Sequence, residues 1–226
     1  MTYVVRTERI KTQWIKRGLN QDSIIVLPST IIDPTENINA CRKFVGSPIE
    51  LLIFGQIRKG KSIERVIDIM HELNGFKLTI CGPSLNDDYA YELSQLVSQN
   101  HRVSLDIGFQ DTEEVNNFFL SSDFLLVLYD DDWDPDMESG IVHLAVQYQK
   151  PIICFDGCWI ADVTREYDLG YILSRKDPLA CQLNKLRVNM TSNELIHLRG
   201  INRFMHELGT AASVEKLLHH YRSVLR

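Results

Sequence analysis

Short and almost continuously apolar runs alternate along this chain with longer amphipathic segments. Runs of this kind are typical of strands that are buried on both faces of a parallel sheet. They predict strands over residues 24–28, 49–54, 76–81, 102–107, 123–129, 151–155 and 170–174. The intervening segments carry apolar residues at helical spacing and predict helices over residues 62–73, 87–99, 112–121, 139–148, 159–167 and 178–186.

This regular alternation of strand and helix implies right-handed crossovers and an α/β fold with helices on both faces of the sheet. We therefore expect a Rossmann-like, doubly wound parallel sheet of six strands from Ile49 onward. The 226 residues suffice for one large domain with a buried core, or for a domain with a small appendage. Ligands of such a sheet bind beyond the carboxyl ends of its strands, so the loops there are the places to search.

Two regions lie outside the alternating unit, which spans residues 34–190. Residues 1–33 predict one helix over residues 7–17 and one strand that leads into a linker-like stretch. Residues 191–226 predict two helices that pack on the domain, without a strand. This tail is locally basic, which indicates either a solvated helix face or a surface that meets a membrane or a partner.

Charge and composition exclude several classes of protein. The net charge of −6 argues against nucleic-acid binding, which usually needs a broad basic face. The first residues carry charges throughout and lack the apolar core of a signal peptide, and the longest apolar runs are too short to span a bilayer. The five cysteines follow no metal-binding or disulfide pattern. Together these features predict a cytoplasmic protein with reduced thiols.

The most informative loop follows the predicted strand over residues 49–54 and opens the next helix. This basic loop, residues 54–62, reads FGQIRKGKS and contains two glycines that allow a tight turn, Gly55 and Gly60. Its three cations are Arg58, Lys59 and Lys61. Backbone N–H groups at the start of the helix point at the same space, so the loop predicts a diphosphate site. The alternative is a set of solvated charges; the loop is neither a P-loop nor GxGxxG.

A second loop, the acidic loop of residues 129–139, reads YDDDWDPDMES and precedes another predicted helix. Ser139 is suited to cap that helix, and Gly140 allows a ligand to approach the backbone closely. Asp136 and Glu138 can accept hydrogen bonds from sugar or ribose hydroxyls. A divalent cation is conceivable among six carboxylates, but the spacing matches no EF-hand, and we expect no metal. An exposed acidic loop is the alternative.

Weaker signals lie at two other strand ends and in the histidines. Gly82 ends one predicted strand, and residues 108–111, GFQD, follow the next, where backbone groups could hold a base. Either stretch taken alone is merely a turn. Six of the seven histidines fall in predicted helices, and none is expected to pair with a carboxylate.

At these residues the chain resembles a known family, the C-terminal lobe of family-4, GT-B-type retaining glycosyltransferases. The basic loop is similar to the family's pattern FGxIRxxKG. The resemblance continues through three further stretches, which read LTICGP, VSLDIGFQDTEEVNNFFLSSDFLLVLY and MESGIVHLAVQYQKPII. It covers roughly residues 5–190, and the motifs occur in the family's order.

The resemblance implies a lobe that binds a UDP-sugar or GDP-sugar and transfers the sugar to a glycan or lipid-linked acceptor without a cofactor. Arg58 and Lys61 fall on the positions that stabilise the leaving diphosphate. The positions that would contact the nucleotide sugar are Gly55, Gly82, Phe109, Gln110, Asp136, Glu138, Ser139 and Gly140. It also implies an N-terminal lobe longer than residues 1–33, present elsewhere or as a separate subunit, and peripheral membrane contact through the acceptor.

Four positions depart from the family pattern. Ser62 and Gln149 stand where the family prefers glycine. Two family glutamates, spaced by seven residues, fall on Asp136 and Leu144. These departures leave open a non-catalytic, nucleotide-binding partner subunit or pseudoenzyme, and a third alternative is another nucleotide-binding α/β enzyme, such as a sugar-nucleotide epimerase.

Overall fold

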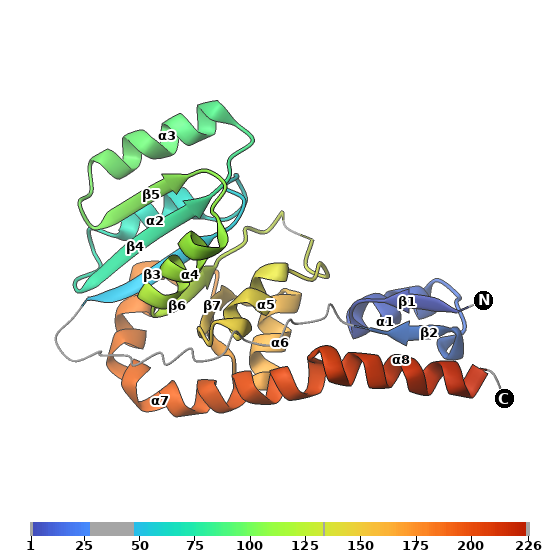
Figure 1. The fold of residues 1–226 in the computed structure, drawn as a ribbon. Helices are drawn as coiled ribbons and strands as arrows, with labels where there is room; N and C mark the ends of the chain where they lie inside the picture. The colour runs from blue at the N-terminus through green and yellow to red at the C-terminus, as the bar shows by residue number, and fades with distance from the viewer. Residues whose placement is uncertain (1, 28–47, 133, 225–226) are drawn as a thin grey trace.

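A six-stranded parallel sheet forms the centre of the computed structural model, which describes residues 2–27, 48–132 and 134–224. Its strand order is β5-β4-β3-β6-β7-β8, with every neighbouring pair parallel (Figure 1). The strands are β3 (Ile49–Phe54), β4 (Phe76–Gly82), β5 (Val103–Ile107), β6 (Phe124–Val127), β7 (Ile152–Phe155) and β8 (Gly170–Leu173). The chain order reverses between β3 and β6, so the predicted doubly wound fold is confirmed.

Two hydrophobic clusters lie on the two faces of the sheet. Successive residues of β3 point to opposite faces, so Leu51 and Ile53 belong to one cluster and Leu52 to the other. The first face is covered by α2 (Ile63–Ile69) and α3 (Asp87–Ser98). The second is covered by α4 (Thr112–Ser121), α5 (Gly140–Gln147) and α6 (Trp159–Tyr167). Burial on both faces explains why the strands are apolar without alternation.

Local signals set several helix boundaries. The helices α4 and α6 have the predicted bounds. The cap of α4 is a capping box in which Asp111 accepts from the Glu114 amide and the Glu114 carboxylate accepts from the Asp111 amide. The helix α2 ends at Ile69, four residues before the predicted end, and Met70 and Leu73 continue into the core as a turn.

A small N-terminal unit precedes the sheet. It contains β1 (Tyr3–Val5), α1 (Glu8–Lys16), a 3-10 turn (Gln21–Ser23) and β2 (Ile24–Val26), with β1 parallel to β2. The helix and the second strand were expected, whereas β1 was missed because three residues are too few to show a periodic pattern. The linker-like stretch predicted after β2 lies outside the described residues.

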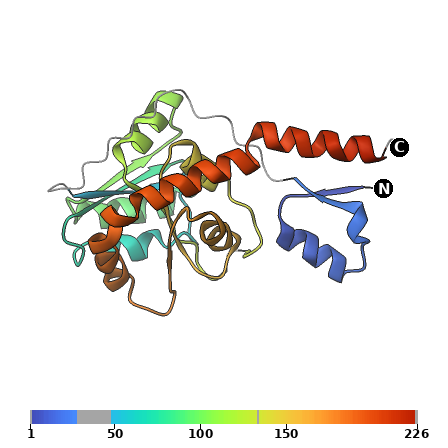
Figure 2. The ribbon, with the colours of Figure 1, turned by 90° about the horizontal axis from the view of Figure 1, so that it is seen from below.

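The C-terminal region differs from the prediction. The expected helix over residues 178–186 and the first tail helix form one helix, α7 (Leu179–Leu208), and α8 (Thr210–Val224) follows. The expected boundary between residues 190 and 191 lies inside α7. Leu183 packs on the first face of the sheet and Phe204 on the second, so one long helix serves both. Figures 1 and 2 show α8 leaving the lobe on the side of the N-terminal unit.

Gly200 allows α7 to cross close to α6. A methyl group on this glycine would lie 1.8 Å from the carbonyl oxygen of Tyr167, the last residue of α6. This close approach is why the helix continues through a glycine that would otherwise weaken it. No helix in the described ranges is long and apolar enough to cross a membrane.

Candidate functional site

The basic and acidic loops meet at the carboxyl edge of the sheet. They follow β3 and β6, which are neighbours at the point where the strand order reverses. The Asp130 amide donates to the Gly60 carbonyl at 3.0 Å, and the Ser62 hydroxyl donates to the Asp130 carboxylate. The sheet therefore brings together two loops that lie almost 70 residues apart in the sequence. Parallel α/β sheets bind their ligands at such a reversal point.

Two of the predicted glycines lie at this edge of the sheet, at the ends of β3 and β4. Gly55 has a φ of 91° and Gly82 a φ of 144°, values that favour glycine. A methyl group on Gly82 would lie 2.1 Å from the Gly55 carbonyl oxygen. The ends of β3 and β4 can approach this closely only because position 82 has no side chain.

Lys61 folds back over Gly55 and lies near Arg58. Its Nζ is 3.8 Å from the position that a methyl group on Gly55 would take. Burial, and secondarily the charge of Arg58, lower the pKa of Lys61 to about 8. Both effects disfavour the charged form of Lys61. An anion placed between the two cations would favour that form again. Of the three loop cations, Lys59 instead reaches Glu92, at 3.8 Å, and is 73% exposed.

The two positions where the family prefers glycine have left-handed backbone. Ser62 has a φ of 52° and Gln149 a φ of 53°. Glycine adopts this region without the steric cost that other residues incur, which explains the family preference. The serine and the glutamine therefore add local strain, but the backbone keeps the conformation that a glycine would adopt at these positions.

Asp136, one of the two predicted sugar ligands, is bound by α1. Arg9 Nε lies 2.6 Å from its Oδ1, and the Gln13 side chain donates to its Oδ2. The same arginine reaches Asp162 of α6 at 2.7 Å. The acidic loop thus contacts the N-terminal unit at the position that falls on the first family glutamate.

The Glu138 carboxylate points to His143 of α5, whose Nε2 lies 2.8 Å from Oε1. Both side chains are buried, with 8% and 11% exposed. The expectation that no histidine pairs with a carboxylate is therefore wrong. The signal was the five-residue spacing, which places Glu138 just before the first turn of α5 and His143 within it.

Ser139 occupies the N-cap position of α5, but its side chain does not cap the helix. Its hydroxyl instead pairs with the Tyr129 hydroxyl at 3.0 Å. Burial raises the pKa of Tyr129, so this phenol stays protonated. The expected side-chain cap is wrong because a buried tyrosine competes for the serine.

The backbone at the start of α5 remains available to a ligand. The Val142 amide already donates to Ser139, whereas the first two helical amides, those of Gly140 and Ile141, have no acceptor within the helix. Apart from its chain neighbours and the backbone of its own helix, no described atom lies within 4 Å of the position that a methyl group on Gly140 would take. The close approach of a ligand at Gly140 stays a prediction.

The predicted base contacts lie at the next strand end. Phe109 is 89% exposed just after β5, and Gln110 is half-buried. The Gly108 amide donates to the Gly82 carbonyl at 3.1 Å, which joins this turn to the end of β4. Phe109 and Gln110 thus follow the outermost strand of the same carboxyl edge, two strands from the basic loop.

Arg175, which follows β8, was missed by the sequence analysis. It donates to the carbonyls of Tyr129 at 2.7 Å and Asp156 at 3.2 Å, and it pairs with Asp131 at 3.2 Å. It thereby ties the ends of β6, β7 and β8 together. The available signal was a basic residue directly after a predicted strand.

The carboxylates of the acidic loop disperse toward different partners. Within the described ranges, no three histidine, cysteine, aspartate or glutamate side chains are placed to share a metal ion. The expectation of a metal-free reaction stays a prediction.

Solved structures of glycosyltransferases resemble this fold. Anabaena Alr3699/HepE in complex with UDP matches with a TM-score of 0.78 and 15% identity, over 98% of this chain and 64% of that one. The lipopolysaccharide outer core galactosyltransferase WaaB matches with a TM-score of 0.69 and 17% identity, over 98% and 62%. The chain therefore spans less than two thirds of the length of these proteins.

An isolated lobe gives the complementary comparison. The C-terminal domain of the group 1 glycosyl transferase LpcC from Francisella tularensis matches with a TM-score of 0.54 and 20% identity, over 80% of this chain and 97% of that domain. No curated protein matches in sequence. The sheet and its flanking helices are thus a C-terminal lobe of the GT-B fold. The family model for glycosyl transferases group 1 matches residues 35–189, and the chain belongs to this family.

Proposed function

We propose that the chain is the donor-binding part of a retaining, family-4 glycosyltransferase, which binds a UDP-sugar or GDP-sugar in the crevice between the basic and acidic loops. The observation that carries this proposal is the pair of Arg58 and Lys61, since burial and the charge of Arg58 disfavour the charged form of Lys61 until an anion joins the two side chains. The similarity to a protein solved with UDP supports the same class of ligand.

Arg58 and Lys61 act on the diphosphate. As the bond to the sugar breaks, negative charge grows on the leaving phosphate, and two cations fixed in a partly buried crevice stabilise it without a metal ion. The amides of Gly140 and Ile141, at the positive end of α5, add to this effect.

The remaining predicted residues bind the nucleoside and the sugar. Phe109 and Gln110 contact the base, and Gly55 and Gly82 give the crevice its floor. On the sugar side, Ser139 and the carboxylates of Asp136 and Glu138 orient hydroxyl groups, directly or through the loop that they stabilise. Each of these assignments is part of the proposal.

The proposed enzyme needs more than this chain. We propose that residues 1–33 belong to an N-terminal lobe that binds the acceptor, and that residues 34–190 and 191–226 are the donor-binding domain and its C-terminal helices. Alone, the chain should bind nucleotide but transfer sugar poorly. The proposed setting is the cytoplasm, at the inner face of a membrane where the acceptor is lipid-linked, with no role for nucleic acid.

Titration calorimetry with UDP and GDP tests the proposal. Arg58→Ala should weaken binding by about 1–3 kcal/mol, the loss typical of a charge-assisted hydrogen bond. Lys59→Ala is the matched control, since it removes an exposed cation from the same loop and should leave the affinity unchanged. Equal affinities for wild type and Arg58→Ala would argue strongly against the diphosphate site.

A non-catalytic, nucleotide-binding partner subunit or pseudoenzyme is the second candidate. It is favoured by Leu144, which packs against the core where the family has a glutamate, and by Asp136, whose carboxylate is held by α1. Nucleotide binding without release of UDP or GDP from the sugar nucleotide, even after an acceptor-binding lobe is supplied, would favour this candidate.

A further inference from the structure

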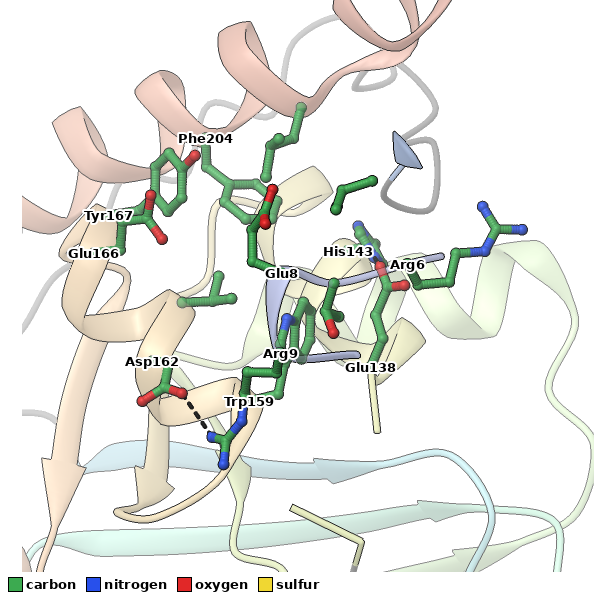
Figure 3. A pocket seen from close by; sticks show the side chains of 14 residues that line it. Arg6, Glu8, Arg9, Glu138, His143, Trp159, Asp162, Glu166, Tyr167 and Phe204 are labelled. Carbon is green, nitrogen blue, oxygen red and sulfur yellow. Dashed lines mark hydrogen bonds and ion pairs between the residues drawn. The ribbon is translucent and has the colours of Figure 1, made fainter. Parts of the chain in front are cut away.

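The N-terminal unit contacts the acidic loop through two side chains of α1. Arg9 pairs with Asp136 at 2.6 Å and with Asp162 at 2.7 Å, and Gln13 donates to the other oxygen of Asp136. Figure 3 shows Arg9 beside Trp159, with its guanidinium group directed at Asp162. One arginine therefore joins α1 to both the acidic loop and α6, on which that loop rests.

Contacts from both parts of the chain hold the second half of the acidic loop. Within the lobe, the Trp159 amide donates to the Pro135 carbonyl at 2.7 Å, His143 pairs with Glu138, and Tyr129, at the start of the same loop, pairs with Ser139. The contact on Asp136 comes from α1. Asp136 is thus the point at which the position of the N-terminal unit can change the loop that leads into α5.

A cavity lies beside these contacts, between α1 and the acidic loop. It measures about 440 Å³ and is lined by Ile10 and Gln13 of α1, by Asp136, and by Gly140 at the start of α5. A ligand group bound at the start of α5 would therefore face α1 across the cavity. The diphosphate would meet the basic loop, whereas the group on the far side would be the sugar.

We propose that Arg9 and Gln13 are positioning residues for the sugar part of the donor. They hold both carboxylate oxygens of Asp136 and so fix the loop between Asp134 and Gly140 in the arrangement that accepts the sugar. The inference rests on the proposed donor site. It adds a coupling between that site and the N-terminal unit, through named side chains.

Arginine suits this role because its planar group can bind two carboxylates in fixed directions at once. A lysine would reach one of the two and hold it less rigidly. Coupling of this kind is reciprocal: if contact with α1 strengthens sugar-nucleotide binding, the sugar nucleotide must strengthen the contact by the same factor.

The experiment compares nucleotide with nucleotide sugar on the full chain. The pairs are UDP with UDP-glucose, UDP with UDP-galactose, and GDP with GDP-mannose, and the pair that the wild type binds most tightly is used. Arg9→Ala should lower the affinity for the nucleotide sugar about five- to tenfold and leave the affinity for the nucleotide unchanged. The expected loss is small because Arg9 is partly exposed. Arg9→Lys should lie in between.

Arg165→Ala is the matched control. Arg165 pairs with the same Asp162 at 3.3 Å and with Asp156, but it does not touch Asp136. This variant should bind both ligands as the wild type does. A second readout is amide hydrogen exchange in α1, which the nucleotide sugar should slow in the wild type and leave unchanged in Arg9→Ala.

Two outcomes would overturn the inference. If Arg9→Ala weakened nucleotide and nucleotide sugar equally, or neither, Arg9 would serve only to attach α1. If the wild type bound no nucleotide, the donor site itself would fail, and the coupling with it. The first outcome leaves the donor site intact, so the two failures are distinguishable.

Discussion

The basic and acidic loops lie side by side at one edge of the sheet, yet their charges are used in opposite ways. In the basic loop, burial and a second cation lower the pKa of Lys61. The charged lysine is therefore destabilised, and a bound anion would stabilise it. In the acidic loop, three of the carboxylates pair with basic side chains, namely Asp131 with Arg175, Asp136 with Arg9 and Glu138 with His143.

This difference distinguishes charges that are placed to bind a ligand from charges that stabilise the protein. Both loops have the same position in the fold and a similar density of charge. What separates them is the surroundings of a charge: burial and a like charge disfavour the charged form of Lys61, whereas oppositely charged side chains lie beside Asp131 and Asp136. We therefore expect changes in the basic loop to alter ligand binding, and changes in the acidic loop to alter stability first.

The largest expected effect concerns the backbone beneath the basic loop. Gly82→Ala should lower the free energy of unfolding by about 3–5 kcal/mol, because its methyl group would collide with the Gly55 carbonyl and its φ is unsuited to alanine. Gly140→Ala, with open space around it, should change stability little. Urea denaturation measures both. Similar stabilities for the two variants would contradict the packing of β3 against β4.

The next effect tests whether the acidic loop is structural. His143→Leu should cost about 2–3 kcal/mol of stability, because it removes the imidazole that pairs with the largely buried Glu138 carboxylate. The double variant His143→Leu with Glu138→Leu should recover part of this loss. Denaturation curves of the wild type, the two single variants and the double variant measure the coupling. A double variant as unstable as the two losses added together would show that the pair does not interact.

A smaller effect is the pH dependence of nucleotide binding. The Lys61 pKa is about 8 in the free protein, and a bound phosphate would raise it, so above pH 8 binding must take up a proton. The affinity for a nucleotide sugar, whose phosphates do not titrate in this range, should be constant below pH 7 and fall about tenfold per pH unit above pH 8, until the pKa of the complex is reached. Calorimetry between pH 6 and about 9.5 measures this. Lys61→Arg should bind with no such decline, and a decline that persisted in it would assign the proton to another group.

The smallest effect concerns the strain at the end of α5. Gln149→Gly should raise stability by about 0.5–1 kcal/mol, because glycine adopts the left-handed conformation freely. Gln147→Gly, the same exchange at the last residue of α5, should lower stability by about as much. Opposite shifts in the thermal midpoint would support the backbone explanation. Shifts of the same sign would show that the Gln149 side chain matters more than its φ.

The sequence by itself determined the layers of this protein and the edge of the sheet at which the two charged loops meet. A strand buried on both faces is a nearly continuous apolar run, such as residues 49–54. A helix that covers a sheet has apolar residues at helical spacing. These are local patterns, so the six strands of the sheet and the bounds of α4 and α6 could be predicted. Ser62 and Gln149 could be marked as departures, although only the structure gave the reason in their φ values.

The tertiary structure alone decided which side chains meet. Gln13 and Asp136 are 123 residues apart, and no local pattern records their contact. Lys150 reads as a surface lysine, yet it is 2% exposed and donates to the Ser122 carbonyl at 2.7 Å, near the end of α4. The long helix α7 is likewise set by packing on both faces of the sheet. A sequence encodes the burial of each residue through its own chemistry, whereas the partner of a buried charge is chosen only when distant elements come together.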